Sequence, residues 1–124
     1  MDCVILAAGK GTRMKSKHPK VLQEIGGKPL IGHLLGSIYP LEFANVIVVI
    51  GYKEERVRDE LEDRSVEFVV QENQRGTAHA LQQARDKIES NKFMVIPGDL
   101  PLITTSSLKN FIDFTEENKA KLSL

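Results

Sequence analysis

Four short apolar runs, separated by stretches with the periodicity of helices, constrain the fold of this 124-residue chain more than any other feature. The runs are unbroken rather than alternating, which is typical of strands that are buried on both faces of a sheet. An alternation of such strands with helices predicts an α/β fold with a mainly parallel sheet and right-handed crossovers. The expected strands are residues 2–7, 45–50, 66–70 and 93–96.

Helices are expected at residues 29–38, 53–63 and 77–89, and from about 104 or 105 onward. Pro29 opens the first, because its fixed φ suits the first turn of a helix. Thr77 is expected to cap the third, and Thr104 or Thr105 the fourth, since a threonine hydroxyl can accept a bond from a free backbone N–H. Residues 21–28 are interpreted as a connector, and the alternation at 120–124 indicates the opening of a further strand.

A glycine-rich, positively charged loop follows the first expected strand. Small residues let its backbone close tightly on a ligand, and glycine permits positive φ. The loop carries five cations and no acid, which suits a phosphate group. The small residues are Ala7, Ala8, Gly9 and Gly11, and the cations are Lys10, Arg13, Lys15, Lys17 and Lys20. An ordinary glycine-rich turn with solvated lysines is the alternative interpretation, and solvent is the expected surrounding of Lys10, Lys15 and Lys17.

Two common phosphate-binding patterns fail in this loop. The P-loop pattern G-x-x-x-x-G-K-[ST] needs a glycine where the chain has Met14. The dinucleotide pattern G-x-G-x-x-G begins at Gly9 and fails at the same methionine. It also requires an acid at the end of the second strand, where the chain has Gly51, Tyr52 and Lys53. Neither pattern therefore describes the loop.

A third kind of loop does match. The stretch Leu6-Ala-Ala-Gly-Lys-Gly-Thr-Arg-Met14, followed by Pro19-Lys20 and Gly27-Lys28-Pro29-Leu30, resembles the signature loop of sugar nucleotidyltransferases. Residues 71–80 and 98–103 resemble the uracil loop and the metal loop of the bacterial N-acetylglucosamine-1-phosphate uridyltransferases. The resemblance implies a Rossmann-like nucleotide-diphospho-sugar transferase sheet. It also implies that residues 1–124 are the N-terminal, nucleotide-binding part of the transferase domain, truncated after roughly its first half.

The resemblance assigns a role to individual residues. Arg13 and Lys20 are expected to be catalytic by holding the phosphates, and Asp99 is expected to bind Mg²⁺ as the cofactor. An amide side chain such as that of Gln71 offers both a donor and an acceptor, which matches the edge of uracil. The substrate-binding residues are expected to be Leu6, Ala7, Ala8, Gly9, Gly11, Gln71, Gln74, Gly76 and Thr77. His79, in the first turn of the expected third helix, is interpreted as packed or pocket-lining rather than catalytic, and His18 and His33 are interpreted as residues without a functional role.

The implied reaction is Mg²⁺-dependent nucleotidyl transfer from UTP to a sugar 1-phosphate, with N-acetylglucosamine 1-phosphate as the expected acceptor, in a step of cell wall biosynthesis. The alternatives are a sister enzyme that reads another base, or a non-catalytic nucleotide-binding module or fragment. In the resembled family a second metal ligand and the sugar pocket come from later sequence. We therefore expect this chain to bind UTP weakly and to turn over negligibly. We also expect it to self-associate as a homo-oligomer through the open edge of the strand at 93–96.

The charge balance sets limits on partners. The 17 basic and 17 acidic residues give no net attraction to nucleic acid or to an anionic membrane. No apolar run reaches the roughly 18 residues of a membrane span, and no signal-peptide pattern opens the chain. The single cysteine, Cys3, lies in an apolar strand and is interpreted as a small buried hydrophobe. These features fit a cytoplasmic protein.

Overall fold

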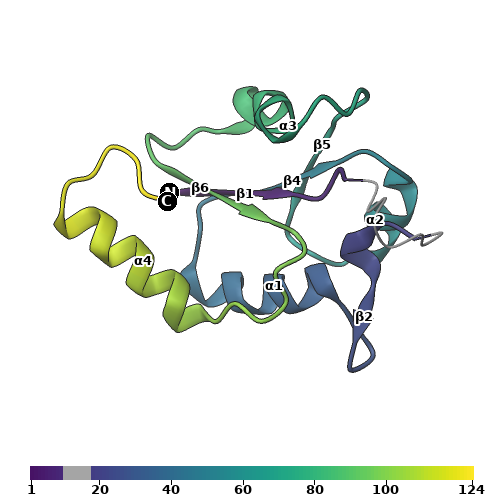
Figure 1. Cartoon of the computed structure of the whole chain (residues 1–124), viewed down its shortest axis with the longest axis horizontal. Coiled ribbons are helices and arrows are strands. Elements are labelled where there is room, and N and C mark those ends of the chain that lie inside the picture. Colours follow the sequence, from purple (N-terminus) through teal and green to yellow (C-terminus); the bar gives the residue numbers. More distant parts are fainter. Residues whose placement is uncertain (10–17) are drawn as a thin grey trace.

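The computed structural model describes residues 1–9 and 18–124 and has a four-stranded parallel sheet at its centre, in the order β5-β4-β1-β6 (Figure 1). The strands are β1 (Asp2–Leu6), β4 (Val46–Ile50), β5 (Glu67–Val70) and β6 (Phe93–Pro97). In the register, Ile5 of β1 lies between Val48 of β4 and Ile96 of β6. All five residues of β4 are buried, as an unbroken β-branched run requires. The predicted α/β class and the parallel sheet are confirmed.

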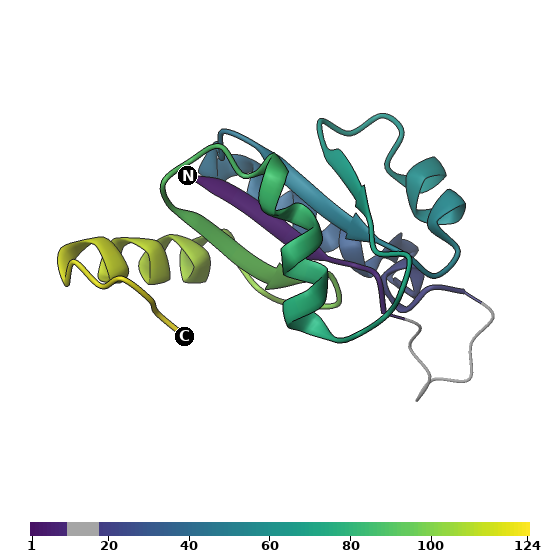
Figure 2. The same cartoon turned by 90° about the horizontal axis from the view of Figure 1, so that it is seen from above.

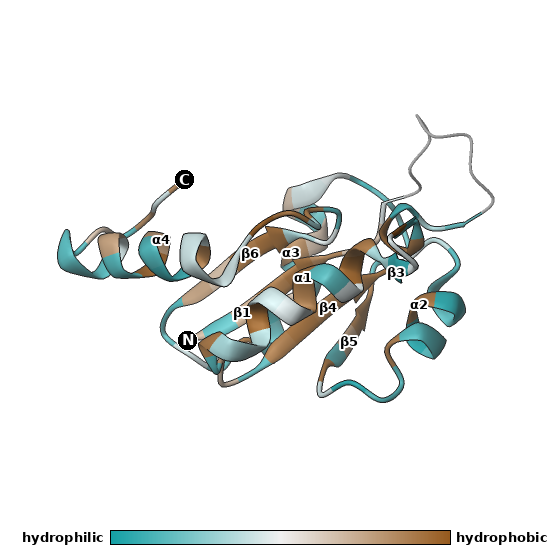
Figure 3. Cartoon of the chain, turned by 90° about the horizontal axis from the view of Figure 1, so that it is seen from below, coloured by the Kyte–Doolittle hydropathy of each residue, from teal (hydrophilic) through white to brown (hydrophobic). Residues whose placement is uncertain are grey.

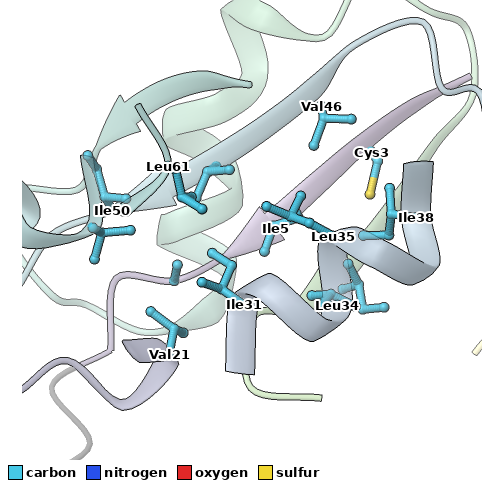
Figure 4. Close-up of a cluster of buried hydrophobic side chains, with 14 of the residues drawn as sticks. Cys3, Ile5, Val21, Ile31, Leu34, Leu35, Ile38, Val46, Ile50 and Leu61 are labelled. Carbon is cyan, nitrogen blue, oxygen red and sulfur yellow. The ribbon is translucent and has the colours of Figure 1, made fainter. Parts of the chain in front are cut away.

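Helices cover both faces of the sheet. The larger core cluster lies between one face and α1 (Leu30–Ile38), α2 (Glu54–Glu60) and α4 (Thr105–Glu117). Figure 4 shows this cluster, in which Ile31, Leu34 and Leu35 of α1 pack against the strands. The other face is covered by α3 (Thr77–Ala84), whose Ala80 and Ala84 pack against Val4 and Val49. The polar surface of α2, teal in Figure 3, agrees with the prediction that its charges are solvated.

Cys3 belongs to the larger cluster and has no exposed surface. Burial raises the pKa of its thiol to about 12. The thiol therefore stays protonated and behaves as a small apolar side chain, as the sequence indicates.

The segment expected to be a plain connector is structured, so that prediction was incomplete. It contains a short 3₁₀ helix, η2 (Lys20–Leu22), and a hairpin of β2 (Glu24–Ile25) and β3 (Lys28–Pro29). The two residues between these strands, Gly26 and Gly27, have φ values of 60° and 75°. A two-residue hairpin turn with two positive φ angles needs residues such as these glycines. His33 Nε2 donates to the carbonyl oxygen of Ile25, 2.7 Å away, and fastens the hairpin to α1.

Several predicted helix ends differ from the observed ones. Thr77 is the first helical residue rather than the cap, because Gly76 occupies the capping position with a φ of 98°. The helix α3 gives way after Ala84 to a 3₁₀ turn, η4 (Arg85–Lys87). A second short 3₁₀ helix, η3 (Tyr39–Leu41), follows α1. The prediction for α4 is confirmed, since the hydroxyl of Thr104 accepts from the backbone N–H of Ser107 at 3.1 Å.

The last residues do not form the strand that their alternation suggested. After α4 the chain turns at Lys119, which has a φ of 51°, and the backbone N–H of Ala120 bonds back to Thr115. In the described part of the chain, residues 120–124 have no neighbouring strand with which to pair. A strand gains its hydrogen bonds only from such a neighbour, so the alternation alone was insufficient.

The strand β6 lies at one edge of the described sheet. It includes Pro97, whose nitrogen carries no hydrogen. The backbone N–H of Gly98 donates to the carbonyl oxygen of Leu6, so the nitrogen of Pro97 faces the open edge, where no donor is needed. On the α3 side of the sheet, Phe93 and Val95 remain 45% and 37% exposed. The expected open, partly apolar side is therefore present, and association of copies through it stays a prediction. Among the described residues, no helix is long and apolar enough to cross a membrane.

Candidate functional site

The loops that carry the three motifs begin at one end of the sheet, where the parallel strands end (Figure 2). Backbone bonds tie the loops together at this end. The N–H of Ala7 donates to Val49 at 2.8 Å, that of Gln71 to Ile50 at 2.7 Å, and that of Gly98 to Leu6 at 2.9 Å. Since ligands of parallel α/β sheets bind beyond the carboxyl ends of the strands, this end is the candidate site.

Glycine is required at two positions at this end for lack of space. A Cβ on Gly51 would lie 3.0 Å from the carbonyl oxygen of Gln71 and 3.2 Å from Cβ of Ala8. A Cβ on Gly98 would lie 2.9 Å from Cγ1 of Val21 and 3.2 Å from the carbonyl oxygen of Leu6. The absence of these two side chains lets the loops after β1, β4, β5 and β6 approach one another.

The close packing on Gly98 brings Lys20 to Asp99. Pro19 is buried at the start of η2, and Val21 is buried against Gly98, so the side chain of Lys20 points along the β6 loop. Its Nζ lies 2.5 Å from Oδ2 of Asp99, and the two side chains are 42% and 27% exposed. The sequence predicted these residues for two different loops and two different tasks. The structure places them in one ion pair.

The carboxylate of Asp99 suits Mg²⁺ on the chemistry of its donor set. No group of three or more histidine, cysteine, aspartate or glutamate side chains that could enclose a metal is found in the described ranges. Mg²⁺ usually takes one or two carboxylates and completes its shell with water and substrate phosphate oxygens. A single partly exposed carboxylate beside a phosphate-suited loop fits that requirement.

The β5 loop holds a second group of polar side chains. Gln71 is only 4% exposed, and its Nε2 lies 3.2 Å from the carbonyl oxygen of Gly76 and 2.9 Å from Nδ1 of His79. Gln74 reaches across to the first loop, where its Nε2 donates to the carbonyl oxygen of Ala8 at 2.5 Å. Gly76 caps α3 with a φ of 98°, a backbone conformation that residues with a Cβ rarely adopt, so glycine is required there. Thr77 is exposed at the start of that helix.

An open hollow of about 480 Å³ lies beside these residues. Its lining includes Gln71 and Gln74, together with residues that were not among the predicted site residues: Gly51, Tyr52, Glu54, Val70, Glu72 and Asn73. Another hollow, of about 410 Å³, is lined by Asn45, Val46 and Glu67 at the amino ends of β4 and β5. It lies at the opposite end of the sheet and takes no part in the candidate site.

The predicted site residues of the first loop are placed in part. Leu6 is partly exposed, Ala7 and Ala8 are buried, and Gly9 is exposed with free space where a Cβ would stand. Gly11 and Arg13 lie outside the described residues. The structure therefore brings Lys20 to Asp99 and Gln74 to Ala8, just after β1. The side chain of Gln71 contacts Gly76 and His79 instead.

Sequence reasoning underestimated three residues. His79 was interpreted as packed or pocket-lining, but it holds the amide of Gln71, and its spacing of eight residues from Gln71 gave no signal of that contact. Gly51 was noted only as the end of a strand. His18 was expected to be unremarkable, and its Nδ1 lies 2.8 Å from Nη1 of Arg56.

A parallel sheet covered by helices on both faces, with its loops gathered at the carboxyl ends, places the chain in the class of open α/β domains that bind ligands at that edge. Within that class, the family model of the MobA-like NTP transferase domain matches residues 3–123. The chain therefore belongs to the MobA-like NTP transferase domain family.

Individual relatives agree with this assignment. The chain is 44% identical over 118 residues to the bifunctional protein GlmU of Francisella tularensis subsp. novicida, a match that covers 95% of the chain and 26% of that protein. The chain thus spans about a quarter of the length of the curated relatives that it matches.

Solved structures of nucleotidyltransferases share the fold. HddC from Yersinia pseudotuberculosis, complexed with GMP-PN, superposes with a TM-score of 0.78 at 31% identity, covering 92% of this chain and 53% of that one. The inositol-1-phosphate CTP transferase from T. maritima superposes with a TM-score of 0.72 at 27% identity, covering 87% and 46%.

Proposed function

We propose that this chain is the N-terminal, nucleotide-binding part of an enzyme that transfers a uridylyl group from UTP to a sugar 1-phosphate, with N-acetylglucosamine 1-phosphate as the acceptor. The observation that carries the proposal is the contact between Lys20 and Asp99 at the carboxyl end of the sheet. A cation for phosphate and a carboxylate for a metal are the charges that nucleotidyl transfer requires, and here they are adjacent. The choice of uridine and of this sugar rests on the resemblance of residues 71–80 and 98–103 to the loops of the N-acetylglucosamine-1-phosphate uridyltransferases.

The reaction needs no protein nucleophile. An oxygen of the sugar phosphate bonds to the α-phosphorus of UTP while the bond from that phosphorus to the bridging oxygen breaks, and pyrophosphate leaves with the electron pair. The protein contributes positioning and charge stabilisation. In this proposal Lys20 offsets negative charge near the α-phosphorus, and Arg13 holds the outer phosphates through its two-pronged guanidinium.

Asp99 would hold Mg²⁺, which when bound offsets charge on the phosphate oxygens. In the structure the carboxylate of Asp99 is paired with the ammonium group of Lys20. Arrival of a phosphate gives Lys20 a second anionic partner, and the carboxylate becomes available to a cation. Metal and nucleotide are therefore expected to bind cooperatively, each more tightly in the presence of the other.

The base is assigned to the β5 loop. Gln71, Gln74, Gly76 and Thr77 surround the start of α3, and the first two line the hollow of about 480 Å³. The exposed Gly76 lets a ligand approach the backbone, and the residues Leu6 to Gly9 and Gly11 of the first loop would lie against the nucleotide.

A second candidate is a binding module without turnover. The observation in its favour is the length of the chain, which covers about a quarter of GlmU and about half of HddC. Another base is a further candidate, since HddC was solved with GMP-PN and the T. maritima protein is a CTP transferase.

Calorimetric titration with UTP in the presence of Mg²⁺ tests the proposal. We expect weak binding, and we expect Arg13→Ala to lower the nucleotide affinity by about 1.5 to 3 kcal/mol. Lys87→Ala is the matched control, because Lys87 pairs with Glu67 at the amino end of the sheet. Equal affinities in the wild type and Arg13→Ala would remove Arg13 from the site.

Pyrophosphate release with N-acetylglucosamine 1-phosphate then separates an enzyme from a binding module. We expect negligible release from the isolated chain and measurable release when the chain is extended to the full length of its natural protein. Binding of UTP without release from the full-length protein would support the binding module instead.

A further inference from the structure

The amide of Gln71 is held in one orientation by its neighbours. Its nitrogen lies 3.2 Å from the carbonyl oxygen of Gly76, which can only accept a hydrogen bond. The amide must therefore turn its NH₂ group, and not its oxygen, toward Gly76. The same nitrogen lies 2.9 Å from Nδ1 of His79, so its second hydrogen is donated to the imidazole.

This donation fixes the state of the imidazole. To accept from Gln71, Nδ1 of His79 must carry no hydrogen, and in the neutral ring Nε2 then carries it. The side-chain nitrogen of Gln83 lies 3.3 Å from Nε2. The amide of Gln83 accepts the hydrogen of Nε2 once it is turned so that its oxygen faces the ring. A chain of hydrogen bonds thus runs from Gln83 through His79 and Gln71 to the cap of α3.

Both hydrogens of the Gln71 amide are used, so its oxygen Oε1 is the part that remains for a ligand. Within the described residues no donor contacts Oε1. The hydroxyl of Tyr39 is the single buried side-chain oxygen or nitrogen without a partner in the same ranges, so Oε1 is reachable from outside although Gln71 is almost fully buried. The site therefore offers an acceptor, and no donor, from this residue.

We propose that His79 is a positioning residue for base specificity, acting through the hydrogen-bonded amide of Gln71 so that the site accepts the ring N–H of a uracil and disfavours cytosine. This inference rests on the proposed function. Uracil carries a hydrogen on N3 and can donate to Oε1, whereas the N3 of cytosine carries a lone pair that an acceptor repels. Without His79 only the bond to Gly76 restrains the amide, and rotation can then offer its NH₂ group to cytosine.

The test measures the affinities of UTP and CTP, each with Mg²⁺, for the wild-type chain and for variants at position 79. His79→Phe keeps an aromatic ring and removes the acceptor, and we expect it to lower the preference for UTP over CTP about tenfold. His79→Asn returns an acceptor near the position of Nδ1 and should recover most of the preference. Gln82→Ala, an exposed residue on the same helix, is the matched control and should leave the ratio unchanged.

The outcomes separate this inference from the proposed function. A wild-type chain that binds no nucleotide overturns the proposed function, and the inference with it. A wild-type chain that prefers UTP, together with a His79→Phe variant in which both affinities fall in parallel at an unchanged ratio, overturns the inference alone, because a purely structural role predicts that result.

A measurement on the wild type protects the test against a variant that fails to fold. Nitrogen-15 NMR of the imidazole distinguishes the two neutral tautomers. We expect the hydrogen of His79 on Nε2 and a ring coupling between Nδ1 and the side-chain amide of Gln71. A hydrogen on Nδ1 of the neutral ring would overturn the proposal.

Discussion

The two ends of the sheet each hold a carboxylate, and these carboxylates differ in their burial and in their bonding partners. At the amino end, Asp2 has no exposed surface, and its oxygens accept four bonds: from the N–H of Glu89 at 2.8 Å, the N–H of Ser90 at 2.9 Å, the hydroxyl of Ser90 at 2.7 Å and Nδ2 of Asn45 at 3.1 Å. At the carboxyl end, Asp99 is 27% exposed and pairs with one flexible lysine.

The difference shows how the chain separates stability from binding. Burial by itself would raise the pKa of Asp2, but the bonds from Ser90, Glu89 and Asn45 outweigh it and lower the pKa to about 2. A carboxylate satisfied in this way by the protein has nothing left to offer a ligand, and it connects the start of β1 to the turn before β6. The pair of Lys20 and Asp99 can exchange its partners at little cost to the fold.

The largest effect is expected at the amino end. Asp2→Ala removes a fully buried carboxylate and leaves two part-buried backbone N–H groups without their acceptor, and we expect the free energy of unfolding to fall by about 3 kcal/mol. Chemical denaturation measures this loss. Asn45→Ala, which removes a single donor, should cost about 1 kcal/mol. A loss of nucleotide affinity in the folded fraction of Asp2→Ala would contradict the comparison, because it would give the amino end a role in binding.

Acid should destabilise the protein through the same residue. The pKa of Asp2 is about 2 in the folded protein against an ordinary value of 3.8, so the carboxylate contributes stability above pH 3.8 that is lost as the pH falls toward 2. The difference corresponds to about 2 kcal/mol. Unfolding free energies between pH 5 and pH 2, measured for the wild type and for Asp2→Asn, should show this contribution in the wild type alone.

A smaller loss of folding stability is expected from a substitution in the closely packed carboxyl end of the sheet, at Gly98. Gly98→Ala places a Cβ 2.9 Å from Val21, so η2 must shift, and we expect a loss of about 1 to 2 kcal/mol. Gly9→Ala is the matched control in the first loop, because no atom of the described residues lies within 4 Å of its added Cβ. Equal melting temperatures for Gly98→Ala and the wild type would show that the Lys20 segment is not held by Gly98.

The central sheet could be predicted because burial on both faces leaves a direct mark on the sequence. Val46 to Ile50 admit only apolar residues, and the unbroken run shows it. The hairpin after η2 was missed because its strands are two residues long and mostly exposed, so they leave no apolar run, although the pair Gly26-Gly27 is a known hairpin signal. Thr77 was assigned as a cap from its side chain, while the backbone of Gly76 decided the position.

The sequence motifs propose the residues of the candidate site one by one, but they do not give the contacts between those residues. Lys20 and Asp99 follow from separate motifs, and no local pattern relates two residues so far apart in the chain. The bonds from Gln71 to His79 and from Gln74 to Ala8 depend on how α3 and the β1 loop are placed by the sheet. Local propensity cannot give that placement.

The smallest effect on stability, with a clear effect on binding, is expected from the exposed ion pair. Pairs of this exposure contribute at most about 1 kcal/mol, so Lys20→Ala and Asp99→Asn should each move the melting temperature very little. Lys20→Ala should nevertheless weaken the binding of UTP, and Asp99→Asn should weaken the binding of Mg²⁺ in the presence of UTP. Each substitution removes one of the two charges at the site. The pair of Lys109 and Asp113 on α4, 2.7 Å apart, provides the control, since Lys109→Ala removes an exposed ion pair away from the loops. If Asp99→Asn unfolded the protein while metal binding stayed normal, Asp99 would be a structural residue like Asp2, and the two ends of the sheet would not differ in the way described.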